Sequence, residues 1–194
     1  MDKNSNYTGK ADFTFQDGST YSGEWVDGKQ EGHGLMIFSN GDRYEGDWKC
    51  GRMHGIGEYH FYNKEKQRFS AVYRGQFVDG CREGRGKMKY ANRDIYEGTW
   101  QNNQRTGNGV MWFANGDCFC GLWKFDHMLR GVYSKYDSDK YDGEIKNGQF
   151  DGYGKYYWKS GKWFEGTFQN GKPHNGILIS PEGKMAEYKD GEII

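Results

Sequence analysis

The stretch YSGEWVDGKQEGHGLMIFSNGD, residues 21–42, contains two alternating segments joined by a turn. Tyr21, Gly23 and Trp25 are two residues apart, so in a strand they share one face. The second segment alternates in the same way, at Gly32, Gly34, Met36 and Phe38. VDGKQE between them is typical of a short hairpin loop, and SNGD of the following turn. No window shows the apolar spacing of a helix, so the stretch predicts a β-hairpin.

The same pattern recurs along the chain at a nearly constant interval. It opens with YSGEW at 21, YEGDW at 44, YRGQF at 73, YEGTW at 96, FCGLW at 119, YDGEI at 141 and FEGTF at 164. Successive openings are 23, 29, 23, 23, 22 and 23 residues apart. A fixed period of this kind is the signature of a repeat architecture. The sequence therefore predicts an all-β fold, an elongated, curved, single antiparallel β-meander of tandem β-hairpins.

We expect one repeat array over residues 1–194. An N-terminal half-repeat occupies 7–20, and repeats follow at 21–43, 44–72, 73–95, 96–118, 119–140, 141–163 and 164–187. The second repeat holds an insertion, Asn63 to Val72, that we expect to form a longer hairpin loop. The last is expected to be a degenerate cap, because Pro173 and Pro181 would interrupt a strand ladder. About fifteen strands at ~4.8 Å spacing would make the array roughly 70 Å long.

Glycine within these strands needs a reason, since it usually weakens a sheet or marks a close approach. It falls on the same face as the rings in every unit, so we expect neighbouring rings to lie over the bare backbone. Such ring contacts contribute ~0.5–1.5 kcal/mol each beyond area burial. This structural face includes Tyr21, Gly23, Trp25, Tyr44, Gly46, Trp48, Tyr96, Gly98 and Trp100.

The run Y-x-G-x-W/F, turn glycine, Gly-x-Gly, aromatic, glycine resembles the MORN repeat (membrane occupation and recognition nexus). The resemblance extends from about Gly9 to about Gly176. It implies a trough-like β-meander that serves as a binding and scaffolding module. Members of this family occur in junctional membrane proteins, phosphoinositide kinases, ciliary radial spokes and the cortical cytoskeleton of protists. Some dimerise, and some bind a peptide or helix of a partner.

Composition argues against several other classes of protein. The 27 basic and 27 acidic residues give zero net charge, which does not favour nucleic-acid binding. Four cysteines are too few for a disulfide framework. No apolar stretch approaches the ~20 residues of a membrane span, and the opening MDKNSNYTGK lacks the apolar core of a secretory signal. We expect a cytoplasmic protein.

No chemical motif indicates catalysis, a cofactor or a metal. The Gly-x-Gly pairs precede strands, whereas a phosphate cradle needs a following helix. Cys118 and Cys120 form a C-x-C without the paired spacing of a zinc site. Cys50, His54 and His60 are an equally weak indication of a metal site. We therefore expect a non-enzymatic protein with no cofactor and no metal.

The convex face is the side of the predicted sheet opposite the rings. Its outward positions are usually polar, but around the fifth repeat several are apolar. Alternation places a set of apolar side chains outward, where such patches mark protein contacts. The predicted partner-binding patch is Val110, Trp112, Cys118, Cys120 and Leu122, with Tyr153 and Tyr157 as an extension. The alternative interpretation is local repacking around the irregular fifth repeat.

The third repeat carries a basic stripe. Its members are Arg74, Arg82, Arg85, Lys87, Lys89 and Arg93. Anionic phospholipid, including phosphoinositide, is one candidate partner, since each basic group near a membrane adds ~1 kcal/mol. An acidic protein tail, such as that of tubulin, is another. A solvated face with cross-strand glutamate pairs remains the third interpretation.

The sequence favours a protein-interaction scaffold in a cytoskeletal, ciliary or axonemal assembly, and this placement rests on family analogy. A peripheral membrane adaptor that binds anionic phospholipid through the third repeat is the alternative. The exposed edge strands of an open meander also invite homodimerisation, with the N-terminal edge favoured because proline lies near the other end.

Overall fold

The computed structural model describes residues 6–194; residues 1–5, which we included in the array, lie outside the described part. Across the described residues there are seventeen β-strands and no helix, which confirms the all-β prediction and slightly exceeds the expected strand number. Contacts divide the chain into two units, Met1–Asn103 and Gln104–Ile194. The two units are described separately.

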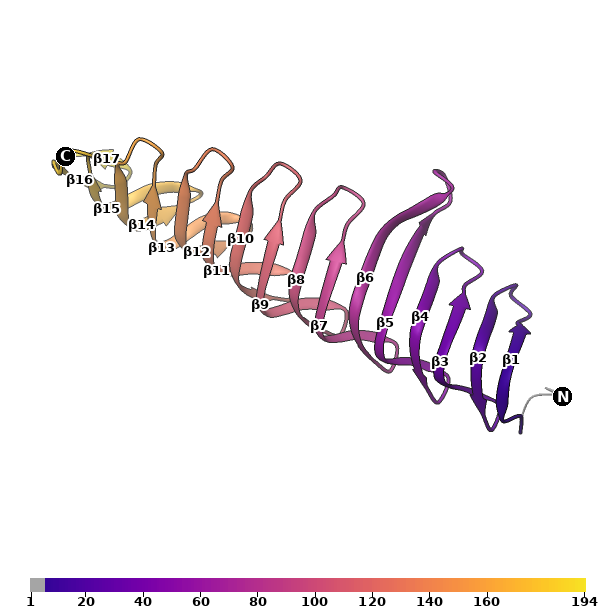
Figure 1. Cartoon of the computed structure of the whole chain (residues 1–194). Coiled ribbons are helices and arrows are strands. Elements are labelled where there is room, and N and C mark those ends of the chain that lie inside the picture. The colour runs from indigo at the N-terminus through magenta and orange to yellow at the C-terminus, as the bar shows by residue number, and fades with distance from the viewer. Residues whose placement is uncertain (1–5) are drawn as a thin grey trace. The chain divides into compact units, whose positions relative to one another are not determined.

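The N-terminal unit is a meander in which each strand pairs antiparallel with the next (Figure 1). Its strands are β1 (Gly9–Thr14), β2 (Thr20–Val26), β3 (Lys29–Ile37), β4 (Arg43–Lys49), β5 (Arg52–Asn63), β6 (Arg68–Val78), β7 (Cys81–Lys89) and β8 (Ile95–Gln101). The pair β2–β3 is the hairpin predicted from residues 21–42. The antiparallel hairpin meander is confirmed here.

The C-terminal unit repeats this topology. Its strands are β9 (Gln104–Trp112), β10 (Cys118–Lys124), β11 (His127–Ser134), β12 (Lys140–Lys146), β13 (Gln149–Tyr157), β14 (Trp163–Gln169), β15 (Lys172–Ile179), β16 (Met185–Lys189) and β17 (Glu192–Ile193). The two strands after Ile179 continue the meander from the end of the seventh repeat to Ile193.

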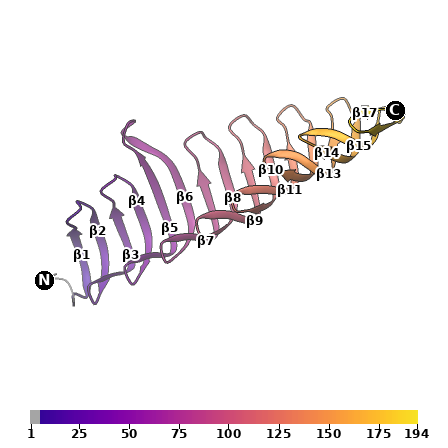
Figure 2. The ribbon, with the colours of Figure 1, turned by 180° about the vertical axis from the view of Figure 1, so that it is seen from behind.

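The insertion in the second repeat lengthens strands instead of forming the long loop we expected. β5 runs to Asn63 and β6 starts at Arg68, so only four residues connect them. Both views show the resulting hairpin projecting beyond its neighbours (Figures 1 and 2). Two ring contacts hold it, because Phe69 packs against His60 and Tyr62 with centroids 5.2 Å and 5.6 Å away.

The proline residues do not end the ladder where we expected. Pro173 lies inside β15, opposite Phe168 at a register shift, where the loss of one N–H is tolerated. Pro181 lies in the turn between β15 and β16. The prediction that these residues interrupt the sheet is therefore wrong, since β16 and β17 still pair beyond them.

The core of each unit is a face of rings over glycines. A Cβ at Gly34 would overlap the ring of Tyr21 from the neighbouring strand, and Gly86 stands in the same relation to Tyr73. The hydroxyl of Tyr21 donates to the carbonyl of Glu24 (3.1 Å), and Trp48 Nε1 donates to the carbonyl of Gly34 (3.2 Å). Because these tyrosine and tryptophan side chains donate their polar hydrogens to backbone carbonyls, the face is both apolar and hydrogen-bonded.

Candidate interaction surfaces

The side of the sheet opposite the buried rings is called the outer face. Strand alternation places Trp112 of β9 and Cys118 of β10 on it, directly opposite each other. Phe119, the next residue on β10, is fully buried on the ring face. The outer face is therefore the surface on which this fold presents side chains that do not build the core.

Register brings the predicted patch together on the outer face of the C-terminal unit. Trp112 pairs with Cys118 and Val110 with Cys120, while Leu122 follows Cys120 along β10. Trp112 is 41% exposed and Leu122 45% exposed. Val132 of β11, which the sequence pattern did not place in the patch, lies opposite Cys120 and adds one member. We call Val110, Trp112, Cys118, Cys120, Leu122 and Val132 the outer apolar patch.

The expected extension of this patch to Tyr153 and Tyr157 is not formed. The strands between are polar on the outer face, where Ser134 pairs with Lys140, and Asp142 separates Val132 from Lys155. Tyr157 instead pairs with Trp163. Alternation alone gave the correct face but could not show how many strands lie between the two groups.

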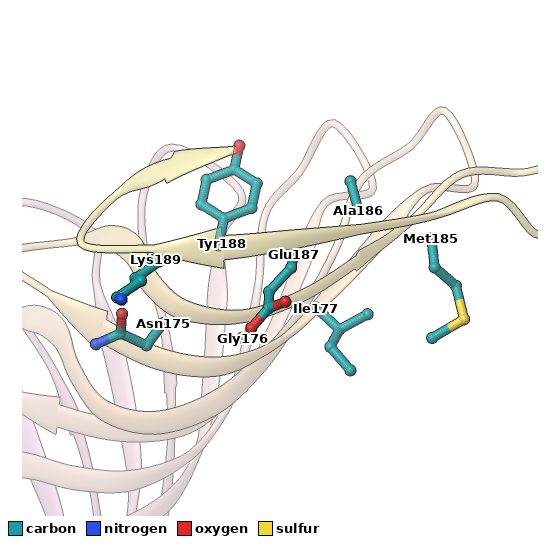
Figure 3. A pocket seen from close by; sticks show the side chains of 8 residues that line it. All are labelled: Asn175, Gly176, Ile177, Met185, Ala186, Glu187, Tyr188 and Lys189. Atoms are coloured by element: carbon teal, nitrogen blue, oxygen red, sulfur yellow. The ribbon is translucent and has the colours of Figure 1, made fainter. Parts of the chain in front are cut away.

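Tyr157 belongs to a second apolar group near the C-terminus. Trp163 pairs with Ile179, and Ile179 pairs with Met185, which is 67% exposed. Figure 3 shows Met185 and Ile177 on the same side of the β15–β16 pair, with Tyr188 on the other. An open hollow here is lined by Asn175, Gly176, Ile177, Met185, Ala186, Glu187, Tyr188 and Lys189.

Cross-strand acids pair part of the basic stripe in the N-terminal unit. The guanidinium of Arg74 forms two hydrogen bonds with the carboxylate of Glu58, and Lys87 Nζ lies 2.8 Å from Glu97 Oε2. The hydrogen bond from Arg74 lowers the pKa of Glu58 below its ordinary value, so the pair stays ionised. These pairs match the solvated-face interpretation.

The remaining stripe residues divide into two kinds. Arg82 stacks on the ring of Trp100, 4.5 Å from its centroid, and donates to the carbonyl of Asn103 (2.9 Å), so it belongs to the ring face. Arg85 and Lys89 alternate on exposed positions of β7, and Arg93 lies in the turn after it. Among the described residues of the stripe, these last three are exposed and form no ion pair, which leaves them available to an anionic partner.

The cysteines are free thiols, and burial raises the pKa of the Cys118 thiol. A raised pKa leaves less thiolate, the form that binds metals and attacks electrophiles. Within the part of the chain that the structure describes, no three His, Cys, Asp or Glu side chains are grouped so as to hold a metal ion. Cys118 therefore serves the patch as a small apolar side chain.

The fold and these surfaces define a tandem β-hairpin repeat protein. The family model of the MORN repeat matches residues 21–43, 44–66, 73–95, 96–118, 141–163 and 164–183. These ranges cover well over half of the sequence, and the chain belongs to the MORN-repeat family. The irregular repeat that opens at Phe119 is not among the matched ranges.

Comparison with curated proteins gives no match. Among solved structures, the TCP10 domain of Danio rerio CPAP in complex with a STIL peptide is 13% identical, with a TM-score of 0.43, and covers 96% of this chain and 97% of that chain. The SAS-4 TCP domain of Drosophila melanogaster with a proline-rich motif of Ana2 is 14% identical, with a TM-score of 0.37, and covers 93% and 89%. Similarity this low carries no information on function.

Residues 6–194 contain no helix with the length and apolar character that crossing a membrane would need.

Proposed function

We propose that this protein is a non-catalytic interaction scaffold that holds a partner protein on its outer apolar patch. The observation that carries the proposal is the placement of Trp112 and Leu122, two large exposed side chains, on adjacent strands of the outer face, together with Val110, Cys120 and Val132. Apolar patches of this kind mark protein contacts, and tryptophan is enriched among the residues that dominate binding energy. The MORN-repeat family supports the proposal as a family of interaction modules.

We also propose that the partner belongs to a cytoskeletal or ciliary assembly in the cytoplasm. This placement rests on the occurrence of the family in radial spokes and in cortical cytoskeleton. Homodimerisation is part of the same proposal, because β1 pairs with β2 on one side and has no strand on its other side among the described residues. Light scattering of the purified chain measures the mass of the assembly and tests for the dimer.

The patch is tested by Trp112→Glu. The side chain points away from the ring face, so the fold should persist while a charge enters the patch. We expect affinity purification from the native cell, followed by mass spectrometry, to recover a partner with the wild type, and we expect the variant to bind that purified partner at least about tenfold more weakly.

Tyr136→Glu is the matched control. Tyr136 is 82% exposed and lies in the turn before β12, outside the patch, so the same charge there should leave binding unchanged. Circular dichroism of both variants verifies that the strands persist. Unchanged affinity of Trp112→Glu for the partner would exclude the patch as the interface.

The alternative function, a membrane adaptor, is favoured by Arg85 and Lys89, which are exposed and have no acidic partner among the described residues. Sedimentation with vesicles that contain phosphoinositide, at physiological salt, distinguishes the two functions. Pelleting that is lost in Arg85→Gln/Lys89→Gln would support the adaptor, whereas no pelleting would exclude it. Stable attachment usually needs two membrane signals, so the interaction scaffold remains the preferred proposal.

A further inference from the structure

Successive hairpins are joined at their turns by one recurrent backbone hydrogen bond. The donor is the N–H of the second residue in a hairpin turn, and the acceptor is a carbonyl of the preceding hairpin, close after that hairpin's own turn. Gly51, for example, donates to the carbonyl of Gln30, the second residue after the preceding turn (2.9 Å). The same bond joins Gly80 to Met53, Asn103 to Arg82, Asp126 to Arg105 and Gly171 to Phe150, at 2.8–3.1 Å. At the last junction the acceptor lies one residue further along, because Gly191 donates to the carbonyl of His174 (2.9 Å). It links the turn edge of each hairpin to the next.

One junction of the described chain lacks this bond. By the same spacing Gly148 should donate to the carbonyl of Met128, and no such hydrogen bond is present among the described residues. Pairing of β11 with β12 also stops at Arg130 opposite Glu144. The cause is visible in sequence, because the fifth repeat is one residue short and β11 has eight residues where β9 and β13 have nine.

Leu129 removes a second link at this junction. The third residue after the turn is polar in the other repeats, and at Glu31 its carboxylate accepts the N–H of Cys50 (2.8 Å). Glu83 accepts the N–H of Asn102 in the same way (2.9 Å). Leu129 has no acceptor to offer the N–H of Asn147, so this N–H and that of Gly148 lack their usual partners.

A hollow of about 250 Å³ lies at the unlinked junction. It is lined by Lys124, Phe125, His127, Met128, Leu129, Ile145, Lys146 and Asn147. Ile145 contributes to the space, because the equivalent position holds a larger ring in the other repeats, as at Trp48 and Trp123. The lining therefore combines apolar side chains with backbone groups that have lost their partners.

The turn beside the hollow is strained by an aromatic residue. Phe125 has a φ of 49° and is 58% exposed, at a position where other hairpins carry asparagine, aspartate or cysteine. A bulky side chain in the left-handed region is unfavourable, and such outliers cluster at functional sites. Phe125 lines the hollow at a conformational cost that asparagine or aspartate would reduce.

The charges around the hollow are basic. Lys124 and Lys146 line it, and His127 lies opposite Lys124. Asp126, in the adjoining turn, is already paired, because its carboxylate accepts from Arg105 Nε (2.8 Å). The carboxylate of Glu144 is directed toward Gly152 of β13. An occupant should therefore be anionic where it meets the lysines and apolar where it meets Phe125.

We infer that this junction is a second binding site, for a short acidic peptide segment of a partner protein with one bulky apolar side chain. The apolar side chain enters the hollow against Leu129 and Ile145. A peptide backbone accepts from Gly148 and donates to the carbonyl of Met128, replacing the bond that other junctions form internally. Flanking carboxylates pair with the two lysines. This site is separate from the outer apolar patch.

The probe is the peptide acetyl-Asp-Asp-Leu-Asp-Asp-amide, titrated into the ¹⁵N-labelled full chain by NMR. We expect amide shifts at Gly148, Asn147 and residues 125–129, and we expect them to decrease with added salt. Comparators are the same peptide with glycine in place of leucine and acetyl-Lys-Lys-Leu-Lys-Lys-amide, and both should produce smaller shifts. Equal shifts with the lysine peptide, or shifts spread over the other hairpin turns, would overturn the inference. A response confined to phosphatidylserine vesicles would overturn it in favour of lipid.

Two variants keep the test independent of misfolding. Leu129→Gln restores an acceptor without adding charge, so it should close the junction and weaken the peptide at least about tenfold without lowering the melting temperature. Lys124→Gln/Lys146→Gln should weaken it similarly and remove the salt dependence, while Lys184→Gln/Lys189→Gln, on and beside β16, should not. Unchanged affinity in the first two variants would show that the peptide binds elsewhere. Trp112→Glu should also leave this binding unchanged, which separates the site from the proposed scaffold function.

Discussion

The N-terminal and C-terminal units have the same topology but differ in the continuity of their rings. In the N-terminal unit, edge-to-face contacts run unbroken from Phe13 to Tyr96 with centroids 5.0–5.8 Å apart. In the C-terminal unit Ile145 replaces a ring, and Phe150 stacks flat on Tyr141 at 3.9 Å. The N-terminal unit, with its unbroken series of ring contacts, is the regular one. The irregular unit contains both the outer apolar patch and the unlinked junction.

The largest expected effect is the loss of a ring from the unbroken series. Trp48 is 6% exposed, touches both Tyr21 and Tyr44, and donates to Gly34. Trp48→Ala should lower the free energy of unfolding by ~3–5 kcal/mol, measured by urea denaturation. Ile145→Ala, at the equivalent position of the other unit, should cost about 2 kcal/mol because fewer atoms are lost.

Trp48→Phe is the control for the first prediction. Phe77 already fills this position in the third repeat, so one ring remains, while the bond from Nε1 and part of the buried indole are lost, at about 1–2 kcal/mol. Equal costs for Trp48→Ala and Ile145→Ala would contradict the view that ring continuity separates the units. Because each repeat in an array is coupled mainly to its neighbours, the unfolding of each unit has to be measured with a probe located in that unit.

Alkaline pH should also distinguish the units. Burial raises the pKa of Tyr21 to about 12 and raises the pKa of Tyr44 and Tyr73 still further. The unfolded chain loses these protons near pH 10 while the folded chain keeps them, so stability is constant below about pH 10 and falls above it. Tyr21 alone should cost on the order of 1 kcal/mol at about pH 11.

The C-terminal unit should lose less stability, because Phe119 and Phe164 replace tyrosine there and cannot ionise. Hydrogen exchange of the core amides of each unit, at about pH 9 and about pH 11, measures the difference. Tyr21→Phe should reduce the alkaline loss in the N-terminal unit. A larger loss in the C-terminal unit would show that a group other than these tyrosines controls alkaline unfolding.

The sequence was sufficient to predict the hairpins and the ring face, because alternation of Tyr21, Gly23 and Trp25 has only one structural meaning in a strand. It placed Trp112 on the outer face for the same reason. It could not show that Val132 joins the patch or that Tyr157 leaves it, since both depend on register across several strands. The sequence also contains the short fifth repeat and Leu129, but their effect appears only when Gly148 is placed beside Met128.

The smallest expected effect concerns the two-residue turns. Phe125 and Asn147 occupy equivalent turn positions with φ values of 49° and 52°, and asparagine tolerates this region better than phenylalanine. Phe125→Asn should therefore stabilise the chain by about 1 kcal/mol, and Asn147→Phe should destabilise it by a similar amount, measured by thermal unfolding. A lower melting temperature for Phe125→Asn would mean that ring contacts in the free protein, such as that with Lys124, offset the backbone strain. The expected gain would instead show that Phe125 is retained at a cost to stability, as a residue used in binding would be.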